Sequence, residues 1–310
     1  MVFERSKLLS IFVCITLISG CDDSTRSDLI VDHIEAVSPE IDALRADIKK
    51  IEPFFQPMGE PGQFDWLKTF KEPGQTFDEY IASDPTLPTD GRRTIYVQPI
   101  GKFNAQQTRV IKTTSEYMEA FFGLPVKMLE TKPRLPKLKE PDQRMIDYPQ
   151  HRQLRSGYFL ETVLPPLLPQ DAAALIAFTD EDLYPDTSMF FVFGQASLEN
   201  RVGVWSLWRL DDHADFDTFL RRTLKIAVHE TGHMFSMRHC TKYECVMSGS
   251  NHLGETDRRP IDACPECMAK IAWMNKEKPL DRYKRLVAFA KKYRLKDESA
   301  DFEKKAKAVN

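Results

Sequence analysis

The residues best suited to chemistry lie close together in the last third of the chain. His229-Glu230-Thr231-Gly232-His233 places two histidines four positions apart, with a glutamate beside the first. On a helix, residues four apart differ by about 40° around the axis, so both imidazoles can face one metal ion. Glu230 lies between them and can reach a water molecule without being a ligand. This H-E-x-x-H arrangement predicts a zinc site.

A third ligand is needed, because a catalytic zinc usually has three protein ligands. His239, six residues after His233, is the candidate. Six further helical residues would rotate its side chain by about 240°, away from the metal-facing side. We therefore expect the helix to end between these two histidines.

Four cysteines follow at short spacing: Cys240, Cys245, Cys264 and Cys267. Paired thiolates at such spacing are structural zinc ligands, and four of them make a closed tetrahedral site. In an exported protein, four cysteines would more ordinarily form two disulfides, so that alternative stays open. A redox role for the C-x-x-C pair is disfavoured because the strand and helix context of a thioredoxin-like site is absent.

The hydrophobic pattern indicates which elements must position these residues. We expect strands at 94–100, 125–129, 172–179, 189–193 and 201–210, and helices from Pro39, at 104–122, at 216–234 after an Asp215 N-cap, and near 265–276 and 280–294. The stretch 52–92 reads as loops with short helices, and 131–150 as an exposed loop. Strands with an early helix and a late long helix indicate an α/β domain with a mixed sheet.

The combined motif is more specific than any of its parts. It reads H-E-x-x-H-x-x-S-x-x-H-C-x4-C-x-M, followed by C-x-x-C, and it resembles the signature of the archaemetzincin family of zinc metallopeptidases in the metzincin clan. The segments 182–184, 191–194 and 206–210 also look like that family. The resemblance covers roughly 94–276 and leaves the N-terminal stretch uncovered.

The resemblance implies both a fold and a reaction. The implied fold is a metzincin-like mixed twisted sheet with an active-site helix and a short helical C-terminal part. One zinc on His229, His233 and His239 would activate a water, with Glu230 as general base, and a second zinc would be structural. The substrate would be a peptide or protein lying along an edge strand, near 201–206 by family order.

Met247 and Ser236 also relate to the family pattern. Metzincins place a methionine in a turn beneath the metal, and Met247 fits that position; ordinary core packing is compatible with the same role. Ser236 stands where the motif has a glycine that makes the turn toward the third histidine. A left-handed backbone would cost serine about 1 kcal/mol relative to glycine, and a different turn is the alternative. If Ser236 is left-handed, Ser236→Gly is expected to stabilise the protein by that amount.

The N-terminus has the pattern of an export signal. Arg5 and Lys7 precede an apolar run at 8–18 that is too short to span a bilayer as a mature helix. The run ends in Ser19-Gly20-Cys21, which resembles a bacterial lipobox and implies cleavage before Cys21 and lipid on that residue. The acidic residues that follow favour the inner membrane, with the protein on its periplasmic side. An ordinary secretory signal or a membrane helix are the alternatives.

Length and charge limit the remaining possibilities. With 310 residues, 42% of them hydrophobic, the chain can bury a sizeable core. A formal net charge of -3 gives no indication of a nucleic-acid partner. We divide the chain into a signal peptide at 1–20, a tether and extension of helices and loops at 21–92, and an archaemetzincin-like catalytic domain at 93–310.

Two classes of function fit these observations. The first is a zinc-dependent peptidase, with endopeptidase and aminopeptidase activity both open. The second is a zinc-stabilised binding or scaffold module whose peptidase activity is weak or lost. Glu230 favours the peptidase, because a purely structural metal site does not need a base, whereas Ser236 mildly favours the module.

Overall fold

The computed structural model describes residues 39–310 apart from 187–189, 199 and 212–213. The predicted signal peptide and Cys21 therefore lie outside the described residues. Among the helices of the described part, none combines the length and the apolar character that crossing a membrane requires.

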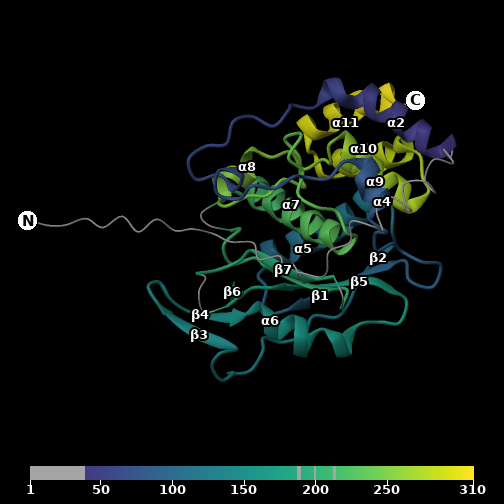
Figure 1. The fold of residues 1–310 in the computed structure, drawn as a ribbon. Coiled ribbons are helices and arrows are strands. Elements are labelled where there is room, and N and C mark those ends of the chain that lie inside the picture. Colours follow the sequence, from purple (N-terminus) through teal and green to yellow (C-terminus); the bar gives the residue numbers. More distant parts are fainter. Residues whose placement is uncertain (1–38, 187–189, 199, 212–213) are drawn as a thin grey trace, which may run out of the picture.

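Five strands form the main sheet, in the order β2-β1-β5-β8-β7 (Figure 1). Their bounds are β1 Thr94–Ile100, β2 Val126–Met128, β5 Ala172–Thr179, β7 Gly194–Ser197 and β8 Val202–Ser206. The first four strands in this order run parallel, and β7 pairs antiparallel with β8. The prediction of an α/β fold with a mixed sheet is confirmed.

Two long helices cover one face of this sheet. Figure 1 shows α5 (Ala105–Phe122) and α7 (Phe216–Met234) on that side, with most other helices beyond them and the short α6 (Ser156–Tyr158) on the opposite side. Asn104 and Asp215 cap α5 and α7 by accepting backbone N–H groups of the first turn, as such residues commonly do. The predicted bounds of both helices are confirmed to within one residue.

The central strand β5 is buried on both faces. Ala174, Ile176 and Phe178 join the core that contains α5 and α7, whereas Leu175 and Ala177 join a second core on the other side. Successive side chains of a strand point to opposite faces, so both faces need apolar residues. This is why β5 reads as a continuous apolar run, as parallel strands covered on both sides do.

A smaller sheet corrects one prediction. Strands β3 (Gln143–Asp147), β4 (Gln150–Arg155) and β6 (Asp182–Tyr184) form a three-stranded sheet in that order. The expectation of an exposed loop over 131–150 is wrong for its second half. The pairing β3–β4 is a partly exposed hairpin of polar residues, so composition alone does not distinguish it from a loop.

The edge of the main sheet corrects two more predictions. A strand was expected at 189–193, but the strand begins at Gly194, and Val192 forms only an isolated bridge with Leu183. Phe191 and Phe193 pack in the core, so this apolar segment is buried without forming a strand. The substrate-binding edge was expected near 201–206, yet β8 lies between β5 and β7, so in the described part of the chain the two edges of this sheet are β2 and β7.

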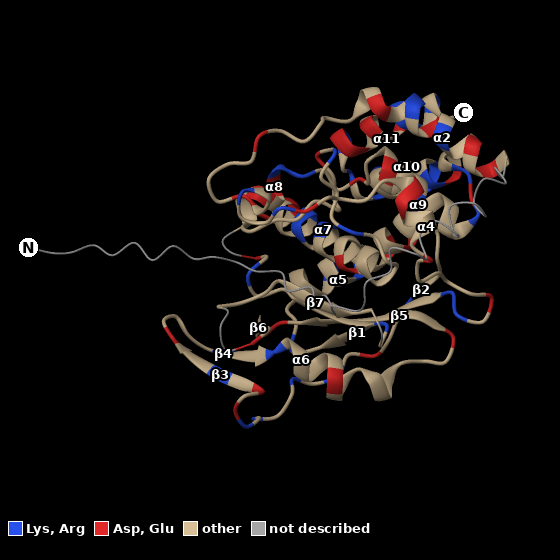
Figure 2. Cartoon of the chain, viewed as in Figure 1, with Lys and Arg blue, Asp and Glu red and all other residues tan. Residues whose placement is uncertain are grey.

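The C-terminal part is helical, as predicted, and holds more helices than expected. It contains α8 (Leu253–Arg258), α9 (Pro265–Asn275), α10 (Pro279–Tyr293) and α11 (Lys296–Ala308). The sequence analysis did not predict α8 and α11; α11 is polar and buries mainly Phe302 and Lys305. Figure 2 shows basic and acidic residues side by side along these helices.

The N-terminal extension packs against this helical part. It contains α2 (Pro39–Ile51), the 3-10 turn Glu52–Phe54, α3 (Trp66–Thr69) and α4 (Phe77–Ala82), which confirms the predicted helix at Pro39 and the short helices after it. Helix α2 contacts α9 and lies near α11, although it comes from the opposite end of the chain (Figure 1). Leu44, Ile48 and Ile51 belong to the same core as the main sheet.

Candidate metal centres

The two histidines of H-E-x-x-H lie side by side at the C-terminal end of α7. The Nε2 atoms of His229 and His233 are 3.0 Å apart, and the two ring centroids are 4.6 Å apart. Both side chains are buried. The pairing follows from helix geometry, because residues four apart lie on one face.

The opposite ring nitrogens identify the tautomer of each histidine. The Nδ1 of His229 lies 2.8 Å from the carbonyl oxygen of Val246, and the Nδ1 of His233 lies 2.6 Å from that of Met237. A carbonyl oxygen only accepts hydrogen bonds, so each Nδ1 carries the proton and donates it. Each Nε2 then carries a lone pair directed at the space between the rings.

His239 joins the pair because the chain reverses after α7. The helix ends at Met234, and Ser236 adopts a left-handed conformation with φ +63°, which confirms the predicted helix end. The ring centroid of His239 lies 5.2 Å from that of His229 and 4.9 Å from that of His233. Its Nε2 is buried and has no hydrogen-bond partner among the described residues.

The three imidazoles fit a zinc ion. Their ligand atoms lie within 4.8 Å of one another. Two of these nitrogens face each other at 3.0 Å with no proton between them, an unfavourable contact that a cation would resolve. Burial lowers the pKa of His229 to about 3 and that of His233 well below its usual value, so both rings are neutral at pH 7. Neutral imidazole is the form that binds metal.

Glu230 lies beside this cluster without joining it. Its side chain is buried, and burial raises its pKa to about 8. A cavity of ≈ 20 Å³ touches both Glu230 and His229, with Phe193, Val246 and Arg259 in its other walls. A volume of this size holds about one water molecule. The carboxyl group of Glu230 and the imidazole of His229 therefore both border a space for about one water.

Met247 packs directly against α7 between the two histidines. A Cβ placed on Gly232 would lie only 2.7 Å from the Sδ of Met247, so this glycine allows the helix and the methionine to approach. The carbonyl oxygen of Met247 also accepts the N–H of Cys240 at 2.8 Å. Met247 is fully buried. It thus packs in the core and supports the site at the same time.

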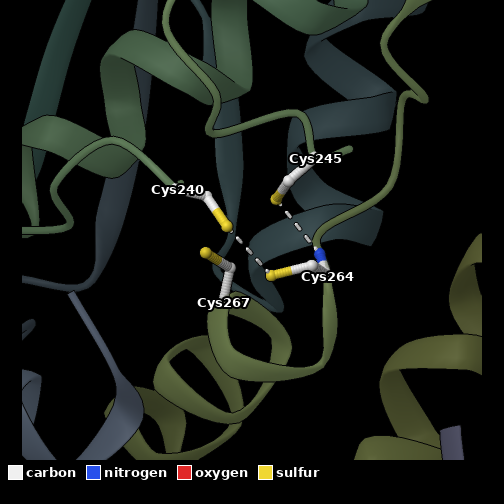
Figure 3. Close-up of side chains that lie close together, drawn as sticks. All are labelled: Cys240, Cys245, Cys264 and Cys267. Carbon is white, nitrogen blue, oxygen red and sulfur yellow. Dashed lines mark hydrogen bonds between the residues drawn. The ribbon is translucent and has the colours of Figure 1, made fainter. Parts of the chain in front are cut away.

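The four cysteines form a second cluster (Figure 3). Their Sγ atoms lie within 4.8 Å of one another, and those of Cys240 and Cys264 are 3.5 Å apart. Cys264 is the N-cap of α9, and Cys267 follows in the first turn. All four are buried and free, so the structure shows no disulfide among these described cysteines.

Backbone groups also converge on this second cluster. The Sγ of Cys245 accepts the N–H groups of Cys264 at 3.2 Å and Met247 at 3.4 Å. Hydrogen bonds from Cys245 and the other thiols lower the pKa of Cys240, whereas burial raises the pKa of Cys245 and Cys264. N–H donors directed at sulfur favour a thiolate, the form that binds zinc. The four thiols fit a closed zinc site.

The sequence analysis missed two residues near His239, both in the extension. Both carboxylate oxygens of Glu72 lie within hydrogen-bonding distance of its Nδ1, at 2.9 and 3.1 Å. The ring of Trp66 meets the imidazole edge-on, with centroids 5.0 Å apart. Neither residue lies in a motif, and both are far from His239 in sequence. We see no sequence signal that would have identified them.

Among the histidines to which no role was assigned, His151 and His252 fall outside both clusters. His151 hydrogen-bonds through Nε2 to the buried Asp182, and its ring stacks on Trp208. His252 caps α8 by accepting the N–H of Glu255. His33 and His213 lie outside the described residues.

Known proteins resemble this chain over most of its length. A model of Peptidase family M54 matches residues 171–273, the segment that holds both clusters. Archaemetzincin-2 of Pongo abelii is 34% identical over 275 residues, covering 76% of this chain and 73% of the relative. An archaemetzincin of Archaeoglobus fulgidus is 38% identical over 122 residues, covering 39% of this chain and 71% of the relative.

A solved structure is also similar. The crystal structure of an archaemetzincin from Methanopyrus kandleri aligns with a TM-score of 0.49 and 27% identity, over 61% of this chain and 99% of that one. The family assignment rests on the sequence relationship to the archaemetzincins. The chain belongs to the archaemetzincin family, Peptidase family M54, a family of zinc-dependent peptidases.

Proposed function

We propose that this chain hydrolyses peptide bonds in peptides or proteins at the cluster His229, His233 and His239, with Glu230 as the general base. The observation that carries the proposal is the convergence of three imidazole nitrogens beside a buried carboxyl group and a cavity for about one water. Zinc bound to the three imidazoles would polarise a substrate carbonyl and lower the pKa of a coordinated water.

Glu230 contributes the proton transfers. It can take a proton from the water in the cavity and return it to the leaving amine. Burial raises the pKa of the Glu230 carboxyl group to about 8, and a zinc cation held by the neighbouring histidines would lower it again, so that Glu230 is ionised and can accept the proton. Since the carboxyl group touches the cavity and makes no part of the histidine cluster, it is free for this role.

Substitution of Glu230 by glutamine tests the proposal. Glu230→Gln keeps the shape of the side chain and removes the base, so turnover should fall by at least about a hundredfold. Zinc content and thermal stability should stay near wild type. Glu119→Gln, which changes an exposed carboxylate on α5, is the matched control and should cleave like wild type. Cleavage of a mixed peptide library, read by mass spectrometry, avoids dependence on one substrate.

Two outcomes would count against a peptidase that uses Glu230. If zinc-loaded, folded wild type cleaves nothing in the library, the binding or scaffold module becomes the better explanation. If Glu230→Gln cleaves as fast as wild type, the assignment of the base is wrong even though the protein is a peptidase. A chelator should abolish wild-type cleavage, and added zinc should restore it.

We further propose two zinc ions per chain, the second one structural and held by Cys240, Cys245, Cys264 and Cys267. The convergence of four buried thiols supports this number. Four protein ligands leave no position for substrate, so this ion would only stabilise the fold.

We also propose that residues 1–20 are a signal peptide and that the mature chain is a lipoprotein anchored through Cys21 on the periplasmic side of the inner membrane. The support is the apolar run that ends at Ser19-Gly20-Cys21. Cys21→Ser should abolish labelling by a radioactive fatty acid. Recovery of unlipidated wild type that is cleaved elsewhere would contradict the anchor. In the mature chain, 21–92 would be the extension and 93–310 the catalytic part.

A further inference from the structure

The loop that carries the third histidine is held by the N-terminal extension. Several side-chain hydrogen bonds connect them. Tyr80 Oη donates to Phe235 O at 2.9 Å, Gln75 Oε1 accepts from Arg238 N at 3.0 Å, and Ser236 Oγ accepts from Thr86 N at 3.0 Å. These contacts attach both arms of the reversal after α7. The position of His239 therefore depends on a segment that precedes the main sheet.

Glu72 makes the contact closest to the cluster. Its carboxylate faces the Nδ1 of His239 with both oxygens, at 2.9 and 3.1 Å, across 167 positions of sequence. The His239 side chain is only 3% exposed and that of Glu72 is 27% exposed, so the hydrogen bond is shielded from water on the histidine side. A carboxylate only accepts when ionised, so Nδ1 donates and Nε2 keeps its lone pair for the cluster.

Trp66 closes the other side of the imidazole. Its ring lies edge-on to His239, and a Cβ added to Gly249 would come within 2.5 Å of the indole. The glycine just after the methionine turn thus leaves space for this ring. The backbone N–H of Trp66 also donates to the carboxylate of Glu255 at 3.0 Å, which anchors the start of α3. Tryptophan and carboxylate together leave the ring little freedom to rotate.

The other two histidines are oriented differently. His229 and His233 donate to backbone carbonyls of Val246 and Met237, which belong to the catalytic part. Only His239 donates to a charged group, and that group belongs to the extension. A carboxylate partner fixes the tautomer and orientation of a metal-binding imidazole and increases its basicity.

We propose that Glu72 is the positioning residue for His239 and that the N-terminal extension is therefore part of the metal site. This inference rests on the proposed zinc binding by the three histidines. The family motif begins at His229 and includes no residue of the extension, so this role for the extension is additional to the motif. Glu72 does not touch the reacting atoms; it acts through His239.

The test measures metal affinity in the full chain. Competition with a chelator gives the zinc affinity of the histidine site in wild type, Glu72→Gln and Glu72→Ala. Loss of such an outer partner typically lowers metal affinity by about 10–100-fold, which we expect for Glu72→Ala. Glu72→Gln keeps an oxygen that accepts from Nδ1, so its loss should be smaller. Glu60→Gln, an exposed carboxylate of the same extension, should bind like wild type.

A second readout separates positioning from simple stabilisation. With Co²⁺ in the histidine site and zinc in the cysteine site, the ligand-field absorption of Co²⁺ should change in both Glu72 variants and not in Glu60→Gln. If both Glu72 variants bind zinc as tightly as wild type with an unchanged Co²⁺ spectrum, the proposal is overturned. Equal affinity losses in Glu60→Gln would also overturn it.

The variant His239→Ala tells this failure apart from failure of the proposed function. If His239→Ala loses zinc affinity while the Glu72 variants do not, the three-histidine site stands and only the role of Glu72 is wrong. If His239→Ala binds zinc as wild type does, the ligand set itself is wrong, and the role of Glu72 falls with it.

Discussion

The histidine and cysteine clusters are neighbours that differ in the number of ligands they offer to a metal ion. Both are buried, and both bring their ligand atoms within 4.8 Å. The histidine cluster offers three ligands beside Glu230 and a cavity, whereas the cysteine cluster offers four ligands. Three ligands leave a coordination position for chemistry, and four close the site. If both clusters bind zinc, the number of ligands alone would suit the same metal to two tasks.

The two clusters also depend on each other unequally. Cys240 directly follows His239, and its N–H donates to the carbonyl oxygen of Met247. The cysteine cluster therefore holds the loop that carries His239 against α9. His229 and His233, by contrast, are placed by α7 itself. We expect damage to the cysteine cluster to reach the histidine cluster, and damage in the opposite direction to stay local.

The largest expected effect is loss of a thiol. Cys264→Ala should remove the structural zinc, lower stability by several kcal/mol, and weaken zinc binding at the histidine cluster. Structural zinc contributes about 10–16 kcal/mol in zinc-finger peptides, and less is expected here because a large apolar core remains. His233→Ala, the matched change, should lose one zinc with a smaller effect on folding. Metal analysis and thermal unfolding of both variants measure the difference.

The contrast between an open histidine site and a closed cysteine site is wrong if the thiols are not zinc ligands. Native wild type with two disulfides and a single zinc, measured by intact mass and metal analysis, would contradict the four-cysteine site. Equal loss of stability in Cys264→Ala and His233→Ala would contradict the division into a structural and an open site.

An intermediate loss of stability is expected when a methyl group is added to α7 at Gly232. In Gly232→Ala the new Cβ would meet Met247 at 2.7 Å. Overpacking of this kind lowers the free energy of unfolding by about 1–3 kcal/mol. The higher helix propensity of alanine offsets up to about 1 kcal/mol of this loss. We expect a net loss of about 1–2 kcal/mol in urea unfolding. Cleavage should also slow, because Gly232 adjoins His233.

A shorter side chain at Met247 provides the control. If the clash causes the loss, Met247→Ala combined with Gly232→Ala should be less destabilised than the sum of the two single changes. Additive losses would mean that Met247 does not limit the space at Gly232, and that the methionine does not support the helix at this point.

The smallest effect is expected at Ser236, in the reversal between His233 and His239. The sequence alone predicts that Ser236→Gly stabilises the protein by about 1 kcal/mol through relief of left-handed strain. The structure adds a hydrogen bond from Thr86 N–H to the Ser236 hydroxyl, worth about 1 kcal/mol. The two effects oppose each other, so Ser236→Gly should leave the free energy of unfolding nearly unchanged.

Ser236→Ala separates the two contributions. It keeps the strain and loses the hydrogen bond, so it should lower stability by about 1 kcal/mol in urea unfolding. A stabilised Ser236→Gly together with a neutral Ser236→Ala would show that the hydrogen bond contributes nothing. The serine would then be a simple departure from the family pattern.

The sequence by itself determined the features that depend on local geometry. The spacing of His229 and His233 on one helix, the capped bounds of α7 and the apolar run of β5 follow from helix and strand periodicity within short segments. The end of the helix before His239 followed from the same reasoning, because a continuing helix would direct that side chain away.

Only the tertiary structure decided the features that depend on contacts between distant segments. That β7 rather than β8 is an edge strand, that Glu72 faces His239, and that Ser236 binds Thr86 all join parts of the chain with no shared periodicity or motif. A single polar residue in an irregular stretch, such as Glu72, has no local pattern that reveals its partner. The physical reason is that such pairs form only when packing of the extension against the C-terminal helices brings them together.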